Sequence, residues 1–129
     1  MENIKEISGG ITAPAGFYAA SHAAGIKYQG REDMALIYSE VPCKAAGVFT
    51  TNVVKAAPVK WDQKIVKESA YAQAVIINSG IANACTGEEG WRYCQETAEE
   101  AAKVFSILED VGFDDMETRK ASLVLQAML

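Results

Sequence analysis

One stretch of the sequence decides the fold class: Ala74-Val75-Ile76-Ile77, followed by Asn78-Ser79-Gly80-Ile81-Ala82-Asn83-Ala84-Cys85-Thr86-Gly87. Its first part is apolar and rich in β-branched side chains, which is typical of a buried strand. The second part combines small residues with amide and hydroxyl side chains, which is typical of a loop. A helical pattern begins directly after this loop, so the stretch predicts a strand, a loop and a helix in that order.

The helix after the loop has a clear apolar face. Its apolar side chains recur at i, i+3, i+7, i+10, i+11 and i+14, namely at Trp91, Cys94, Ala98, Ala101, Ala102 and Phe105. Thr86 and Glu89 match a capping box, in which the hydroxyl accepts the N3 amide and the carboxylate reaches back to the N-cap amide. Charged residues fill the remaining positions. We therefore expect a capped helix with a solvated, acidic outer face.

Shorter apolar runs predict further elements. Residues 34–38 form a continuous apolar run, residues 45–54 are rich in β-branched side chains, and residues 58–61 alternate apolar and polar, so each predicts strand structure. Asp62 is a candidate N-cap for a short helix that ends at Lys67. Strands that alternate with helices indicate an α/β fold.

The two ends of the chain are less regular. Residues 8–30 carry Pro14 and five of the ten glycines, which predicts short strands and turns. Residues 121–129 are apolar, but their pattern favours neither helix nor strand.

Composition excludes several classes of protein. The chain has 129 residues, 50% hydrophobic and 22% charged, which is typical of one soluble domain. The formal net charge of −5 argues against a nucleic-acid partner. The sequence has no apolar run of 18 residues, and its first segment, MENIKEISGG, has no apolar core, so we predict neither a membrane span nor a secretory signal.

The cysteines and the single histidine suggest no reactive site. Cys43, Cys85 and Cys94 are odd in number and form no Cys-x-x-Cys motif, so they predict free thiols in a reducing cytoplasm. A nucleophilic pair of a cysteine with His22 is an alternative to a partly exposed structural histidine, but no local pattern supports it.

The loop after the central strand is the best candidate for a binding site. It leaves a buried strand and enters the N-terminus of a helix, where backbone N–H groups suit a carboxylate or an oxyanion. The candidate substrate-binding residues are Asn78, Ser79, Gly80, Asn83, Thr86 and Gly87. The alternative is purely structural, because the same residue types form turns and cap helices.

Other polar clusters are weaker candidates. Thr50 and Thr51 follow an apolar run and could line a pocket, although threonine is also common in strands. The acidic segment 88–118 contains neither a calcium-loop pattern nor His-Glu-x-x-His, so no metal site is predicted, and Asp114-Asp115 is at most a weak candidate pair.

Several segments, taken in order, resemble the ornithine acetyltransferase family of arginine biosynthesis, the bifunctional glutamate N-acetyltransferases. They are GGITAPAGF (9–17), AAGIK (23–27), LIYSEVP (36–42), AGVFTTN (46–52), KAAPV (55–59) and NSGIANACTG (78–87). The resemblance covers about residues 8–105 and corresponds to the N-terminal part of the family.

This resemblance implies a function. The family transfers an acetyl group from N-acetylornithine to glutamate, and some members also use acetyl-CoA. The precursor cuts itself before an internal threonine, which becomes an N-terminal nucleophile. A Ser-Thr-Gly-Val-Ile-Gly segment forms the oxyanion hole. The implied fold is an α/β sandwich with sheets between helix layers, and the two chains form a heterotetramer without a metal or other cofactor.

The sequence departs from the family pattern after residue 105. Neither Ser-Thr-Gly-Val-Ile-Gly nor the cleavage motif Met-Ala-Thr-Met-Leu follows, and Thr118 matches neither motif. No catalytic residue of the family can therefore be assigned here. We expect a family-like unit at residues 1–105 and a divergent tail at 106–129.

Three interpretations of this departure stay open. The chain is a truncated or frameshifted enzyme, a non-catalytic subunit that pairs with a separate C-terminal part, or a binding or structural domain derived from the enzyme. The first predicts a chain that is inactive alone, exposes unpaired sheet edges and core surface, and aggregates or oligomerises.

Overall fold

The computed structural model describes residues 4–69, 71–105 and 124–128. Along the chain, the described elements are β1 (Phe17–His22), β2 (Met34–Lys44), α1 (Ala57–Glu68), β3 (Tyr71–Asn78), α2 (Gly87–Phe105) and β4 (Val124–Met128). The α/β class predicted from the sequence is confirmed.

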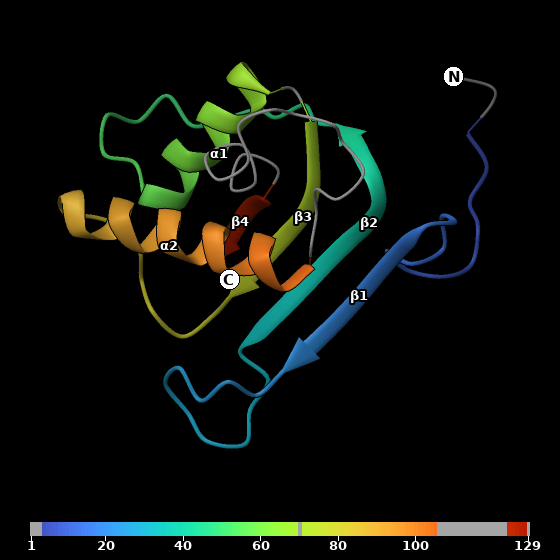
Figure 1. Cartoon of the computed structure of the whole chain (residues 1–129), viewed down its shortest axis with the longest axis horizontal. Coiled ribbons are helices and arrows are strands. Elements are labelled where there is room, and N and C mark those ends of the chain that lie inside the picture. Colours follow the sequence, from blue (N-terminus) through green and yellow to red (C-terminus); the bar gives the residue numbers. More distant parts are fainter. Residues whose placement is uncertain (1–3, 70, 106–123, 129) are drawn as a thin grey trace.

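The strands form one sheet in the order β1-β2-β3-β4 (Figure 1). β1 pairs antiparallel with β2, and β2 pairs antiparallel with β3, whereas β3 and β4 are parallel. The pairing of β2 with β3 shifts register between Tyr38 and Cys43. Because β3 and β4 are parallel, their C-terminal ends lie at the same edge of the sheet, and α2 lies in the connection between them.

Both helices pack on one face of the sheet, where they cover β3 and β4. The core between them is built from Trp61 and Ile65 of α1, Ala74 of β3, and Ala98 and Ala102 of α2. Ala98 is completely buried, and small side chains on α2 let the helices approach closely. The ring centres of Trp61 and Trp91 lie 5.6 Å apart, so this aromatic pair forms the end of the core near the start of α2.

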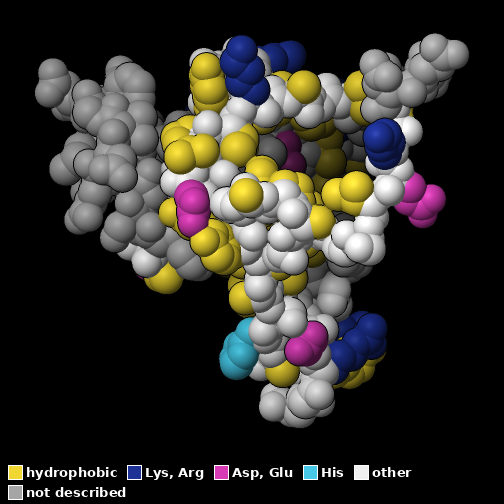
Figure 2. Space-filling view, turned by 90° about the vertical axis from the view of Figure 1, so that its right-hand side faces the viewer, with side chains coloured by type: hydrophobic (Ala, Val, Ile, Leu, Met, Phe, Trp, Pro, Cys, Tyr) yellow, Lys and Arg dark blue, Asp and Glu magenta, His cyan; other side chains and the backbone are white. Residues whose placement is uncertain are grey.

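The opposite face of the sheet has no helix over it within the described residues. Side chains alternate along a strand, so Leu36 and Ile76 point into the core, while Ile37 and Val75 point to the other face. Ile37, Val75 and Ile77 are all half-buried. Figure 2, which looks at the β1 side of the molecule, shows hydrophobic side chains gathered across its middle.

The structure confirms three of the expected elements and extends them. The run at 34–38 lies in β2, the run at 74–77 lies in β3, and the amphipathic pattern forms α2. β1 and its flanking turns match the expectation for residues 8–30. Within the terminal segment, whose pattern favoured neither helix nor strand, β4 is a strand. Glu89, Glu96 and Glu100 are exposed on α2, so the acidic face of this helix is solvated.

Residues 58–61 were expected to form a strand and instead begin α1. Pro58 stands at the start of this helix, where its missing N–H costs nothing and its fixed φ suits the first turn. The N-cap is Ala56, so the prediction of Asp62 as an N-cap is also wrong. Asp62 lies inside the helix, because the N-cap of α1 is six residues earlier than expected.

Residues 45–54 were expected to form strands and are irregular. Short-range hydrogen bonds hold the segment in turns: the N–H of Asn52 donates to the Thr50 hydroxyl at 3.2 Å, and the N–H of Val54 donates to the Asn52 side chain at 3.0 Å. Such local bonds compete with strand pairing. Val48 is fully exposed, so its β-branched side chain does not pack on the sheet.

The start of α2 also differs in detail from the predicted capping box. The Thr86 hydroxyl donates to the Asn83 carbonyl at 3.2 Å, and the Glu89 carboxylate accepts from the Tyr93 hydroxyl at 2.8 Å. The helix itself begins where the pattern predicted. Among the described helices, none is long and apolar enough to span a membrane.

Candidate ligand-binding site

The candidate loop begins where two parallel strands end. Asn78 closes β3 and pairs with Met34 of β2 on one side and with Met128 of β4 on the other. In α/β sheets, ligands bind beyond the C-terminal ends of parallel strands, where the following loops diverge. The loop at 79–86 therefore lies at the edge of the sheet that is best placed to hold a ligand.

The backbone of this loop is bonded to a neighbouring segment at its start and has a positive φ near each end. The N–H of Ser79 donates to the Asp33 carbonyl at 2.9 Å, which ties the loop to the β1–β2 connection. Gly80 has a φ of +95°, and Cys85 has a φ of 60°, an uncommon value for a residue with a Cβ. The loop thus bends sharply after β3 and again just before α2.

The first cavity lies at the far end of the loop, between the N-terminal ends of the helices. It has a volume of about 600 Å³ and is lined by Val53, Val54, Lys55, Ala57, Lys60, Cys85, Thr86, Gly87, Glu88 and Trp91. Its charged side chains are two lysines and one glutamate.

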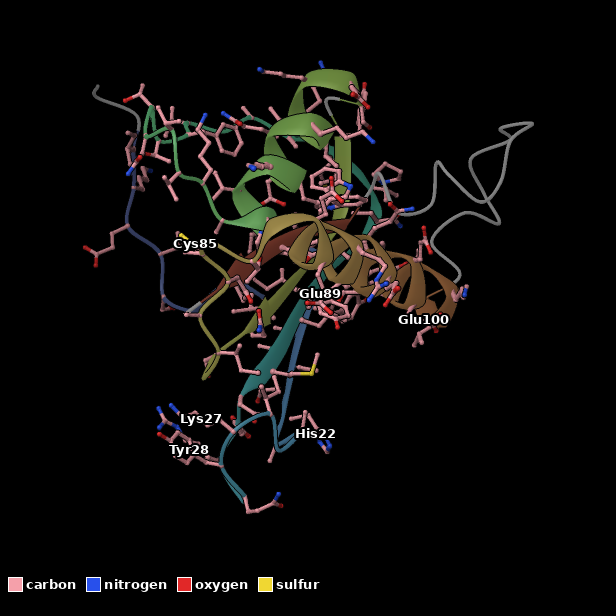
Figure 3. The ribbon with its side chains drawn as sticks, turned by 90° about the vertical axis from the view of Figure 1, so that its left-hand side faces the viewer. His22, Lys27, Tyr28, Cys85, Glu89 and Glu100 are labelled. Carbon is pink, nitrogen blue, oxygen red and sulfur yellow. The ribbon has the colours of Figure 1, made fainter. Side chains whose placement is uncertain are left out.

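The second cavity lies at the near end of the loop, against the β1–β2 connection. It has a volume of about 290 Å³ and is lined by Lys27, Tyr28, Arg31, Asp33, Ser79 and Gly80. In Figure 3, Lys27 and Tyr28 lie at one end of the molecule, well away from Cys85. The two cavities therefore share a loop but not a space.

The structure consequently divides the six predicted residues. Ser79 and Gly80 line the second cavity, and Thr86 and Gly87 line the first. Asn78 belongs to β3, and the carbonyl of Asn83 accepts the Thr86 hydroxyl.

Sequence reasoning missed the charged lining of the second cavity, Lys27, Arg31 and Asp33. The available signal was the charged turn Arg31-Glu32-Asp33 before a buried strand, but nothing local linked that turn to a loop more than 40 residues further along the chain.

Asp33 organises the β1–β2 connection. Its carboxylate oxygens accept the N–H groups of Ala24 at 2.7 Å and of Ile26 at 2.6 Å. Loss of solvent around the side chain acts to raise its pKa, but the backbone N–H groups outweigh this and leave the pKa of Asp33 below its usual value. Asp33 is therefore an anion at neutral pH.

A second carboxylate joins the helices to β4. Asp62 accepts the backbone N–H of Gln126 at 2.8 Å, and the Gln126 side chain donates to the Cys94 carbonyl at 2.5 Å. Burial raises the pKa of Asp62 to about 6, against the opposing effect of the Gln126 N–H. Burial, with the nearby Asp62 charge, raises the pKa of the Cys94 thiol to about 11, so this thiol is protonated at neutral pH.

Among the remaining candidates, Thr50, Thr51 and His22 line neither cavity, whereas Cys85 lines the first. Thr50 and Thr51 are exposed in the irregular segment, and His22 is exposed at the end of β1. All three cysteines are free. Asp114-Asp115 lies outside the described residues. Within the described residues, no group of three His, Cys, Asp or Glu is arranged to hold a metal ion.

A comparison with protein-family models decides the family. The model of the ArgJ family matches residues 18–114, which is more than half of the chain. The chain belongs to the ArgJ family. The resemblance seen in the sequence is thereby confirmed.

Curated relatives within the ArgJ family are similar over most of the chain. The arginine biosynthesis bifunctional protein ArgJ of Gloeobacter violaceus is 48% identical over 106 residues, which is 82% of this chain and 25% of that protein. The protein of the same name from Mycolicibacterium paratuberculosis is 55% identical over 98 residues, covering 75% of this chain and 24% of that protein. The chain thus spans about a quarter of the length of these relatives.

Solved ArgJ structures share the fold. The ArgJ protein of Bacillus halodurans superposes with a TM-score of 0.76 at 34% identity, covering 94% of this chain and 58% of the solved chain. The ornithine acetyltransferase of Mycobacterium tuberculosis, solved in complex with ornithine, gives a TM-score of 0.75 at 48% identity, covering 93% of this chain and 60% of that one.

Proposed function

We propose that the chain is the N-terminal part of a cytoplasmic glutamate N-acetyltransferase, which moves the acetyl group of N-acetylornithine to glutamate. The observation that carries this proposal is the ArgJ family match over residues 18–114. The similarity to an ornithine acetyltransferase solved with ornithine supports an amino-acid substrate of this class. Acetyl-CoA is a second candidate donor, by the resemblance described above.

The chain does not catalyse the transfer alone. The reaction needs a threonine nucleophile with a free α-amine and an oxyanion hole that stabilises the tetrahedral intermediate. The segments of the family that supply these groups are absent from the 129 residues, and each of the six threonines stands in another context. The remaining part of the enzyme, which makes up about three quarters of the length of the relatives, completes the active site.

The uncovered face of the sheet is where that part packs. Ile37, Val75 and Ile77 present a half-buried apolar surface there. Nearby, the Gln73 side-chain oxygen is buried and has no hydrogen-bond partner within the described residues. An apolar sheet face is stabilised by a second layer packed about 10 Å away, and the remaining part of the enzyme supplies that layer. The completed enzyme is an oligomer.

The family-like unit comprises residues 1–105, and β4 adds a fourth strand to its sheet. The boundary at residue 105 stays a prediction, since residues 106–123 lie outside the described residues. Substrates meet this unit along the loop after β3, at Asn78, Ser79 and Gly80 on one side and at Asn83, Thr86 and Gly87 on the other.

A complementation assay tests the proposal. The chain is mixed with the C-terminal three quarters of the Mycolicibacterium paratuberculosis protein, and acetylation of isotope-labelled glutamate is followed by mass spectrometry, with N-acetylornithine or acetyl-CoA as the donor. With N-acetylornithine as the donor, we expect turnover in the mixture and none with either component alone. Turnover of the mixture with acetyl-CoA would show a second donor and leave this expectation unchanged. Turnover by the chain alone would contradict its dependence on a second part, and an inactive mixture whose components form a complex would contradict the proposed reaction.

A further inference from the structure

The first cavity is formed where the two helices begin. A Cβ on Gly90 of α2 would collide with the Thr86 side chain and lie 3.6 Å from the Cβ of Ala57 on α1, so the missing side chain lets the helices approach closely. Trp91, which lines the cavity, packs on Trp61. The walls around this volume of about 600 Å³ are therefore set by the packing of the helices, and the cavity is preformed in the chain alone.

The rim of this cavity is apolar and open to solvent. Val53 is 93% exposed and Val54 is 59% exposed, and both line the cavity. Val48, in the same irregular segment, is fully exposed and does not line it. Exposed apolar side chains that are grouped in one segment indicate a surface that a partner covers. A small molecule inside the cavity would leave Val48 in water, so the pattern favours a polypeptide as the occupant.

Two lysines give the cavity a net positive charge. Lys55 is half-buried and Lys60 is exposed, and the one carboxylate that also lines the cavity is that of Glu88. Neither lysine forms an ion pair with any described residue, whereas Arg92 and Lys103 on α2 do. Both ammonium groups can therefore donate to carboxylates of a partner. Apolar walls beside two cations are complementary to a segment that carries an apolar side chain next to acidic ones.

The cavity lies in the part of the chain that the ArgJ relatives share. Five of its ten lining residues come from two of the segments that carry the family resemblance, 55–59 and 78–87. The matched region is only about a quarter of each of these relatives. The further chain of an enzyme of this length packs against the shared part, and it is therefore the partner that every such enzyme supplies.

We propose that the first cavity is a docking site for an acidic and apolar segment of the remaining part of the enzyme. An apolar side chain of this segment packs between Val53, Val54 and Trp91, and neighbouring carboxylates pair with Lys55 and Lys60. The site lies on the helix side of the sheet, so the remaining part contacts the chain both there and on the uncovered face. The identity of the occupant rests on the proposed function, whereas the chemistry of the cavity does not.

Association of the two parts tests the docking site. The 129-residue chain is titrated with the C-terminal three quarters of the Mycolicibacterium paratuberculosis protein, and the Kd is measured by calorimetry. Lys55→Met and Lys60→Met should each weaken the association about tenfold, since each removes one charge-assisted contact. Lys67→Met is the matched control, because it removes the same charge from the last turn of α1 and lines neither cavity. Failure to associate, equal losses in all three variants, or no loss in the two cavity variants would overturn the proposal.

A thiol in the cavity wall reports its occupancy independently. Cys85, labelled in Figure 3, lines the cavity and is exposed, so iodoacetamide can reach it. With the other part present at a saturating concentration, the rate of Cys85 alkylation, followed by mass spectrometry, should fall at least about tenfold, because only the unbound chain reacts. An unchanged rate in the complex would overturn the site. Protection of Cys85 by self-association of the chain alone would show a second copy in the cavity and overturn the assigned occupant.

The complementation assay separates this proposal from the proposed function. A complex that depends on Lys55 and Lys60 but transfers no acetyl group would contradict the reaction and leave the docking site standing. Acetyl transfer in a mixture whose assembly is insensitive to both substitutions would contradict the docking site and leave the reaction standing. We expect Lys60→Met to raise the concentration of the other part that gives half-maximal turnover about tenfold.

Discussion

The helix-covered region and the β1–β2 hairpin are stabilised in different ways. In the first, α1 and α2 bury Trp61, Ile65 and Ala98 against β3 and β4. In the second, β1 is an exposed edge strand, and the connection after it depends on the hydrogen bonds of Asp33. Apolar burial therefore concentrates on one side of the molecule, while Lys27 and Arg31, which form no ion pair with any described residue, lie on the other. The difference suggests that stability and ligand binding can be altered separately.

The largest expected effect is the loss of an aromatic side chain from the helix-covered region. Trp61 is only 4% exposed and packs on Trp91, so Trp61→Ala should lower the free energy of unfolding by about 3–5 kcal/mol. Tyr28 is 50% exposed, and Tyr28→Ala should cost less than about 0.5 kcal/mol. Urea unfolding followed by circular dichroism measures both. Similar losses in the two variants would show that the two regions do not differ in this way.

A backbone substitution tests how firmly the second cavity is held. Gly80 has a φ of +95°, and a Cβ added there would lie 3.2 Å from the Lys27 Cβ, so Gly80→Ala should cost about 2–3 kcal/mol through backbone strain and a displaced lysine. Gly30→Ala is the matched control, because Gly30 also has a positive φ, +71°, but no atom lies within 4 Å of the added Cβ. The control should cost about 1 kcal/mol. Thermal unfolding gives both values, and equal losses would mean that the contact with Lys27 carries no weight.

The helix-covered region was the easier of the two to predict from sequence. The period of α2 and the β-branched run of β3 report burial directly, because each pattern repeats within one element. Prediction failed where local signals conflict with the fold. Residues 58–61 alternate as a strand does, but Pro58 starts a helix there, and the β-branched residues 45–54 are held in turns by Thr50 and Asn52.

The candidate site was predicted only in part for a related reason. The loop after β3 could be recognised from its own residues, since it follows a buried strand and precedes a helix. Its charged neighbours Lys27, Arg31 and Asp33 reach it through the pairing of β2 with β3, which no local pattern reveals. The sequence also could not show that one loop borders two separate cavities.

A pH titration tests the electrostatics of the helix-covered region. Burial raises the pKa of Asp62 from 3.8 to about 6, so the folded protein binds a proton more tightly there than the unfolded chain does. The stabilisation from this proton is fully present below pH 4 and is lost as the pH rises to about 6. After allowance for partial exposure, we expect a loss of about 1–2 kcal/mol.

The measurement compares the chain with Asp62→Asn, because other carboxylates titrate in the same range. The difference in unfolding free energy between the two proteins should change between about pH 4 and pH 7 and be flat above that range. A difference that is constant with pH would show that Asp62 titrates normally. The β1–β2 hairpin should not share this dependence, since the pKa of Asp33 is shifted in the opposite direction.

The smallest expected effect concerns the outer face of α2. Arg92 pairs with Glu89 at 3.8 Å and with Glu96 at 3.5 Å, but all three side chains are more than half exposed. Water and salt screen such pairs, so Arg92→Ala should change the free energy of unfolding by less than about 0.5 kcal/mol, and added salt should reduce the change further. Urea unfolding at low and high salt measures this. A loss above about 1 kcal/mol would assign part of the stability to the acidic face, whereas the expected result leaves it with the apolar face of the same helix, where Ala98 and Ala102 meet α1 and the sheet.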